Sequence, residues 1–177
     1  DDYILYYEAA KYYANILLLY SHIAAKVVKR IEESGLEITT VAPDHGPVWR
    51  SKIPWIMDLY KKWSARDLKK KALIVYDSMW DSTRMMARAI EDGLTEGGVH
   101  VKVLNATSTS RAEVVTELID AAALIVGSPT LNNHIFPTVA DILTYIKGLK
   151  PRGLVGAAFG SYGWSGESVR VLNAWLE

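Results

Sequence analysis

The stretch "YDSMWDSTRMMARAI" (Tyr76 to Ile90) decides the fold class, because it contains the end of a strand, a short turn and the start of a helix. The apolar run "ALIVY" (Ala72 to Tyr76), which leads into it, is typical of a parallel strand covered on both faces. After the turn, a helix is predicted from Ser82 to Glu96, and Gly97 and Gly98 end it. A strand, a turn and a helix in this order form the repeating unit of an α/β fold.

The same alternation continues along the rest of the chain. The predicted elements are a strand at Val99 to Asn105, a helix at Arg111 to Asp120, a strand at Ala123 to Ser128, a helix at Pro137 to Lys147, a strand at Leu154 to Gly160 and a helix from about Gly166. Strands and helices that alternate through short connections predict a parallel, doubly wound sheet.

The first 70 residues follow a different pattern. Apolar residues at helical spacing predict one long amphipathic helix with a buried face, which Gly35 ends: Tyr12, Ile16, Leu19, Tyr20, Ile23, Val27 and Ile31. A short strand from Glu37 to Ala42 and a loop from Pro43 to Trp49 are predicted next.

A second helix is then predicted from Ile53 to Lys70, with the basic run "RDLKKK" as its solvated end, where positive charge favours the helix dipole. The change of pattern predicts a domain boundary near Leu68 to Lys71, which divides the chain into residues 1–70 and 71–177.

Composition narrows the classes of function. The 177 residues include 20 basic and 20 acidic side chains, so bulk charge favours neither nucleic acid nor an anionic membrane surface as a partner. The absence of cysteine excludes disulfides and Cys-ligated metals within the chain and fits a cytoplasmic protein. The longest apolar run, Ala14 to Ala25, is interrupted by polar residues and is shorter than the roughly 20 residues that span a bilayer. Because the chain starts with Asp1 and stops inside a predicted helix, we expect it to be a piece of a longer protein.

The loop "DSMWDST" (Asp77 to Thr83) has the character of a phosphate site. Ligands of open α/β sheets lie beyond the carboxyl ends of the strands, and the helix that follows this loop offers unpaired amides and a positive dipole end. Hydroxyl side chains can complete a cage around a phosphate there. The loop contains neither the P-loop motif nor the G-x-G-x-x-G of dinucleotide folds. The alternative is ordinary helix capping by Ser82 or Thr83 without a ligand.

Two further loops follow strands at the same predicted edge. "GSPTLNNHIFP" (Gly127 to Pro137) carries groups that can hydrogen-bond the edges of a flat heterocycle. "GSYGWSGE" (Gly160 to Glu167) places Tyr162 and Trp164 among glycines, which suits stacking on a planar ring. Together the three loops predict a site for a mononucleotide with a flat head.

These three loops resemble the flavin mononucleotide (FMN) loops of the flavodoxin-like domain of flavodiiron proteins. "EAAKYYANI" (Glu8 to Ile16) and "VAPDHGPVWR" (Val41 to Arg50) are similar to the end of that family's metallo-β-lactamase-like domain, so the resemblance covers nearly the whole chain. It implies a flavodoxin-like sheet of order 2-1-3-4 without the family's fifth strand, preceded by the C-terminal part of a metallo-β-lactamase-like αββα domain.

The resemblance also implies roles for residues at matching positions. Ser78, Met79, Ser82 and Thr83 would contact the phosphate, with Trp80 beside the flavin; Pro129, Thr130, Leu131, Asn132 and Asn133 would border the ring and ribityl chain; Ser161, Tyr162, Gly163, Trp164 and Gly166 would cover the other side. Asp81 departs from the flavodoxin pattern, which favours glycine at this position. A carboxylate repels a nearby phosphate unless it points to solvent, so Asp81 itself is not expected to contact FMN.

His45 is the position at which the family has an iron ligand, and neutral imidazole suits a non-haem iron. The family's H-x-E-x-D-H ligand cluster has no counterpart in this chain, and His22, His100 and His134 lack ligand spacing to His45. The remaining ligands of a di-iron centre are therefore expected outside this chain.

The function implied is a flavodiiron oxidoreductase, in which electrons from rubredoxin or a reduced deazaflavin pass through FMN to di-iron and reduce dioxygen to water or nitric oxide to nitrous oxide. The family's head-to-tail pairing implies a homodimer. Three alternatives remain open: an FMN electron carrier without catalytic metal; a response-regulator-like module, for which Asp77 lacks the acidic cluster; and a β-lactamase-type metal hydrolase, which leaves the three loops unexplained.

Overall fold

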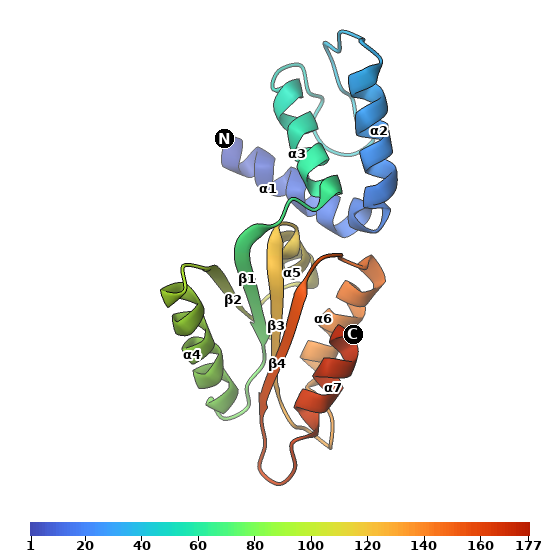
Figure 1. Cartoon of the computed structure of the whole chain (residues 1–177). Helices are drawn as coiled ribbons and strands as arrows, with labels where there is room; N and C mark the ends of the chain where they lie inside the picture. Colours follow the sequence, from blue (N-terminus) through green and yellow to red (C-terminus); the bar gives the residue numbers. More distant parts are fainter.

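The computed structural model describes all residues from 1 to 177 and has two visibly different parts (Figure 1). A helical N-terminal segment lies at the amino ends of the strands, and a sheet flanked by helices makes up the rest. The N-terminal segment contains α1 (Asp2–Tyr12), a π turn (Tyr13–Leu17), a 3-10 turn (Leu18–Tyr20), α2 (Ser21–Glu33) and α3 (Ile53–Ala65).

The prediction of one long regular helix in this segment is wrong. The π turn and the 3-10 turn interrupt it, and α1 and α2 run in different directions on either side (Figure 1). The expected buried face is also wrong in part, because Ile16 and Val27 are 53% and 52% exposed, whereas Tyr13 and Leu18 are buried. A change from 3.6 residues per turn shifts the phase of every later side chain, so a spacing rule for a regular helix selects the wrong face.

Two other predictions for the N-terminal segment are wrong. No strand forms at residues 37–42; only an isolated antiparallel bridge joins Val41 to Trp49. The helix predicted to reach Lys70 ends at Ala65, and Arg66 follows with a left-handed backbone (φ 55°). The basic run then enters the first strand, where Lys71 pairs with the acidic side chains of Glu117 and Asp120.

The sheet agrees with the prediction in strand number, direction and order. Its strands are β1 (Lys69–Tyr76), β2 (His100–Asn105), β3 (Ala121–Pro129) and β4 (Val155–Ser161), all parallel in the order β2-β1-β3-β4. In register, Tyr76 lies beside Asn105 and Gly127, and Gly127 lies beside Phe159. The carboxyl ends of all four strands therefore meet at one edge, which confirms the flavodoxin-like arrangement.

Helices cover both faces of this sheet. They are α4 (Ser82–Glu96), α5 (Arg111–Leu118), α6 (Pro137–Leu149) and α7 (Glu167–Leu176). Ala87 of α4 packs with Ile74 and Phe159 on one face, while buried residues of α5, α6 and α7 pack on Leu73 and Val75 of the other (Figure 1). Coverage on both sides explains why residues 72–76 of β1 form an unbroken apolar run, whereas the strand begins with three lysines.

The larger core cluster continues from the sheet into the N-terminal segment. Tyr13, Leu18 and Trp63 belong to the same buried cluster as Leu73 and Val115. No helix in the structure combines the length and the apolar composition needed to cross a bilayer.

Candidate functional site

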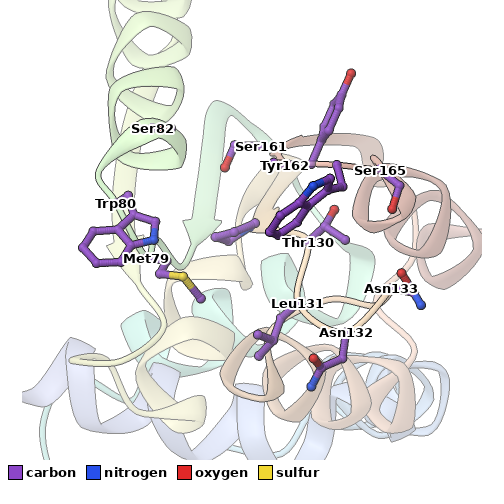
Figure 2. A pocket seen from close by; sticks show the side chains of 13 residues that line it. Met79, Trp80, Ser82, Thr130, Leu131, Asn132, Asn133, Ser161, Tyr162 and Ser165 are labelled. Atoms are coloured by element: carbon purple, nitrogen blue, oxygen red, sulfur yellow. The ribbon is translucent and has the colours of Figure 1, made fainter.

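A cavity of about 610 Å³ opens at the carboxyl ends of the strands, within the size range of small-molecule sites. Its walls come from the three loops that follow β1, β3 and β4 (Figure 2). The lining residues are Met79, Trp80, Ser82, Pro129, Thr130, Leu131, Asn132, Asn133, Ser161, Tyr162, Gly163, Trp164 and Ser165. The structure thus brings together twelve of the residues predicted from the sequence, and Ser165 is an addition.

The loop after β1 turns sharply into α4. Asp81 has a left-handed backbone (φ 63°) directly before the helix, and its carboxylate is exposed and pairs with Arg84 at 2.9 Å. Met79 and Trp80 line the cavity from this loop, and Thr130 and Ser161 line it from the ends of β3 and β4 (Figure 2). The exposed Arg84 side chain offsets the negative charge of the Asp81 carboxylate, which weakens the repulsion expected between Asp81 and a phosphate.

Three predicted residues do not line the cavity. Thr83 is fully buried, and its hydroxyl is 2.8 Å from the Ser161 hydroxyl, which ties the start of α4 to the end of β4. Ser78 lies just behind the lining residue Met79, and its Oγ is buried without a hydrogen-bond partner. Gly166 lies beneath Tyr162, where an added Cβ would meet the phenol ring at 3.0 Å.

The loop after β3 is held by backbone turns that asparagine tolerates. Asn132 and Asn133 both have positive φ angles (50° and 60°), and the backbones of Leu131 and His134 exchange two hydrogen bonds of 2.9 Å around them. Asparagine adopts this conformation more readily than most residues, so the pair "NN" forms a tight two-residue turn. His134 is exposed in this turn and does not line the cavity.

The loop after β4 presents aromatic side chains to solvent. Trp164 is fully exposed and Tyr162 is 66% exposed, which is unusual for such apolar rings unless a partner covers them. The loop is attached at its base, since Thr130 donates its N–H to the Ser161 carbonyl at 2.8 Å and Ser168 donates its N–H to the Thr130 hydroxyl at 3.2 Å. A rigid base below exposed rings suits stacking on a planar group.

Close packing beneath the cavity requires glycine. A Cβ on Gly160 would lie 2.4 Å from the Ser128 carbonyl oxygen, and one on Gly127 would lie 2.2 Å from the Phe159 ring. Neither position can accept a side chain without displacement of the strand or of a buried ring.

Asp77 is a buried polar residue that is not among the predicted flavin contacts. It directly follows β1, is only 5% exposed, and its carboxylate accepts hydrogen bonds from Ser78, Thr107 and Thr138. A carboxylate immediately after an apolar strand was a visible signal, but its partners lie 30 and 61 residues further along the chain. Only the fold brings them to it.

His45 lies apart from this cavity, in the N-terminal segment. It is exposed and lines a second, mainly apolar cavity of about 540 Å³, and its ring centroid is 5.7 Å from that of Tyr12. No three His, Cys, Asp or Glu side chains of this chain come together as a metal-binding group.

Comparison with known proteins places this geometry in a family. Residues 74–177 match the model of the flavodoxin family. A nitric oxide reductase from Moorella thermoacetica is 45% identical over 96% of this chain and 43% of its own length. A rubredoxin-oxygen oxidoreductase from Megalodesulfovibrio gigas is 40% identical over 94% of this chain and 42% of its own length.

Solved structures give the same result. A rubredoxin oxygen:oxidoreductase from Desulfovibrio gigas superimposes with a TM-score of 0.95 and 38% identity over 99% of this chain and 44% of that chain. The flavodiiron protein of Giardia intestinalis has a TM-score of 0.88 and 35% identity over 94% of this chain and 41% of that chain. The chain thus spans about two fifths of the length of these relatives. It belongs to the flavodiiron protein family, of which it contains the flavodoxin-like segment.

Proposed function

We propose that this chain binds FMN in the cavity at the carboxyl ends of β1, β3 and β4, and that it is the electron-entry part of a flavodiiron oxidoreductase. The observation that carries the proposal is the convergence of three loops, predicted separately from sequence, on one cavity of suitable size. The whole protein would reduce dioxygen to water, nitric oxide to nitrous oxide, or both. The names of two relatives, a nitric oxide reductase and a rubredoxin-oxygen oxidoreductase, support nitric oxide and oxygen as the substrates. FMN exchanges one or two electrons when bound.

The loop after β1 would hold the phosphate. Ser82 lines the cavity at the first position of α4, where amides without helical partners and the helix dipole favour an anion. Ser78 supports the fit, because its buried hydroxyl has no partner in this structure and a phosphate oxygen would supply one.

The other two loops would hold the flavin ring and its ribityl chain. Trp80 and Trp164 are 84% and 100% exposed, so covering a flat ring would remove apolar surface from water. Asn132 and Asn133 line the same cavity and carry both donors and acceptors for the polar edge of a flavin or for its hydroxyl chain.

We propose that residues 1–70 are the C-terminal segment of a metallo-β-lactamase-like domain and that residues 71–177 form the flavodoxin-like domain. His45 would ligate one iron of a di-iron centre, with the remaining ligands outside this chain. Its exposed side chain, which lines a cavity, supports this role, because a ligand must be accessible to the metal. The electron donor would be a rubredoxin or a reduced deazaflavin, and the subunits would pair head to tail as a homodimer.

The proposal is tested by visible spectroscopy, chromatography of the released flavin and metal analysis of the protein at its native length. We expect FMN together with about two irons per protomer. Iron without flavin, or no flavin uptake after reconstitution, would contradict the proposed site. His45→Ala should reduce the iron content and leave the FMN content unchanged.

The second candidate is an FMN electron carrier without catalytic metal. It is favoured by one observation: all thirteen residues of the flavin cavity come from this chain, whereas His45 is its only proposed iron ligand. FMN binding without iron in the native-length protein would support this candidate over the oxidoreductase.

A further inference from the structure

Asp77 occupies the point where three segments meet beneath the phosphate loop. Its Oδ1 accepts the Ser78 N–H at 2.7 Å, and its Oδ2 accepts the Thr107 hydroxyl at 3.0 Å and the Thr138 hydroxyl. Thr107 follows β2, and Thr138 is in the first turn of α6. The carboxylate therefore connects the β1 loop to two elements that do not line the cavity.

The burial of Asp77 shows that this connection is a fixed part of the structure. A carboxylate that is 5% exposed is costly unless its oxygens are hydrogen-bonded, and both oxygens of Asp77 are bonded. Asp77 is absent from the cavity lining, so it acts on the loop from behind rather than on a ligand directly.

The bond to Ser78 has a specific consequence for the loop. It occupies the Ser78 amide, while the Ser78 hydroxyl stays buried without a partner. A buried hydroxyl without a bond is rare, and at this position, next in the chain to the cavity-lining Met79, a phosphate oxygen could supply the missing bond. Asp77 thus fixes the orientation of the residue whose hydroxyl is available to a phosphate.

We propose that Asp77 is a positioning residue for the phosphate loop, and that its hydrogen bonds make the site prefer a phosphorylated flavin to one without phosphate. The inference rests on the proposed FMN site. It assigns the preference to hydrogen-bond geometry rather than to charge, because the carboxylate faces three donors and not the cavity.

The test compares FMN with riboflavin, which lacks the phosphate, by fluorescence titration of the 177-residue apoprotein. Asp77→Ala should weaken FMN binding about 10-fold or more and change riboflavin binding by less than about 2-fold. Asp77→Asn should restore most of the affinity, since its amide can accept from Ser78 and donate to the threonine hydroxyls. Circular dichroism and thermal melting establish that each variant is folded.

Two more variants keep the test decisive if Asp77→Ala does not fold. Thr138→Val has nearly the same shape and removes one donor, so it should weaken FMN binding by about 3-fold while riboflavin binding stays unchanged. Asp92→Asn removes an exposed carboxylate from α4 and is the matched control, with no effect on either flavin.

The possible outcomes separate this inference from the proposed function. If the unchanged chain binds neither flavin, the proposed FMN site itself is wrong. If it binds FMN but Asp77→Ala weakens both flavins equally, Asp77 is only structural and the inference fails. An Asp77→Asn variant as weak as Asp77→Ala would also overturn it, because charge would then matter more than geometry.

Discussion

The two ends of the parallel sheet use polar groups in opposite ways. At the amino end, Lys71 is 10% exposed and bonds the side chains of Glu117 at 2.9 Å and Asp120 at 3.0 Å. The guanidinium of Arg66 donates to the carbonyls of Ile119 at 2.8 Å and Arg152 at 3.1 Å. At the carboxyl end, Trp80 and the other exposed aromatics surround an open cavity.

The difference shows where stability and binding are located. Side chains at the amino end use their hydrogen-bonding groups on one another and on the backbone carbonyls of neighbouring elements, although one guanidinium nitrogen of Arg66 has no partner, and Arg66 joins the N-terminal segment to the sheet. Side chains at the carboxyl end leave such groups available, as the buried hydroxyl of Ser78 does. Substitutions of the bonded side chains at the first end should therefore change the free energy of unfolding, and substitutions of cavity-lining side chains at the second should change ligand affinity.

The largest effect is expected at Asp120. Asp120→Asn would leave the buried Lys71 ammonium with Glu117 as its only remaining carboxylate, and should lower the free energy of unfolding by about 3 kcal/mol. FMN affinity should be unchanged. Urea denaturation measures the free energy of unfolding, and flavin titration measures FMN affinity. Glu33→Gln is the control: its pair with Lys29 is mostly exposed, so the substitution should change the free energy of unfolding little. A fall in FMN affinity as large as the fall in stability would contradict the proposed difference between the two ends of the sheet.

The same cluster predicts a pH dependence. Burial acts to raise the pKa of Asp120, but hydrogen bonds and charge from Lys69 and Lys71 outweigh it, so the pKa lies below its usual value. A lowered pKa in the folded state stabilises the protein above the unfolded pKa of about 3.9, and this stability is lost as pH falls through the folded pKa. Melting temperature should therefore drop below about pH 4, and the drop should be smaller in Asp120→Asn. Equal pH profiles for both proteins would contradict this role.

The next effect is expected at Asn15, in the π turn. Its side-chain amide donates to the Ala112 carbonyl at 3.2 Å, and its oxygen accepts the Tyr145 hydroxyl at 2.9 Å, so it joins the N-terminal segment to α5 and α6. Asn15→Ala leaves these part-buried groups without a partner and should cost about 2 kcal/mol in urea denaturation. Asn173→Ala, exposed on α7, is the matched control. Equal effects of the two variants would show that Asn15 contributes nothing specific.

A smaller effect, on FMN affinity rather than on stability, is expected at Trp164. Because this ring is fully exposed, Trp164→Ala should leave the melting temperature of the apoprotein unchanged. FMN binding should weaken by about 1 kcal/mol, the usual contribution of an aromatic stacking contact. Tyr20→Ala removes an aromatic side chain of the N-terminal segment that is 51% exposed, and should change neither quantity. Unaltered FMN affinity in Trp164→Ala would remove this ring from the proposed site.

The smallest effect is expected at Asp81. A left-handed backbone (φ 63°) is unfavourable for a residue with a Cβ, so Asp81→Gly should raise the free energy of unfolding by about 0.5 kcal/mol. Thermal melting of the apoprotein measures the gain, and Asp92→Gly, inside α4, should instead destabilise. A loss of stability in Asp81→Gly would mean that the Arg84 pair outweighs the backbone strain.

The sheet and the cavity could be predicted from sequence because their signals are local. The buried run before Tyr76, the adjacent asparagines 132 and 133 and the glycines around Tyr162 each mark one strand end or turn, and parallel strands bring those ends to a common edge. The turn at Asp81 needed no glycine because aspartate also tolerates the left-handed region.

The predictions from sequence failed where contacts between residues far apart in the chain determine the structure. Lys69 and Lys71 resemble a solvated helix end until Asp120, about fifty residues later, comes beside them and holds them in a strand. The phase change after Tyr13 depends on packing against Trp63 and Tyr60, which a spacing rule does not include. Asp77 was missed for the same reason, since Thr107 and Thr138 reach it only in the folded chain.

The cavity walls follow strands that are direct neighbours in the sheet, since β1 pairs with β3 and β3 pairs with β4. A ligand that contacts all three loops would connect the ends of adjacent strands, so local opening of one loop would require the ligand to be released. The amide protons of Thr130 and Ser168, which are hydrogen-bonded at the base of the cavity, should then exchange with solvent more slowly as ligand concentration rises. Occupancy of the site would become visible in the exchange rates of these two amides, and Ser168 would report it from outside the cavity lining.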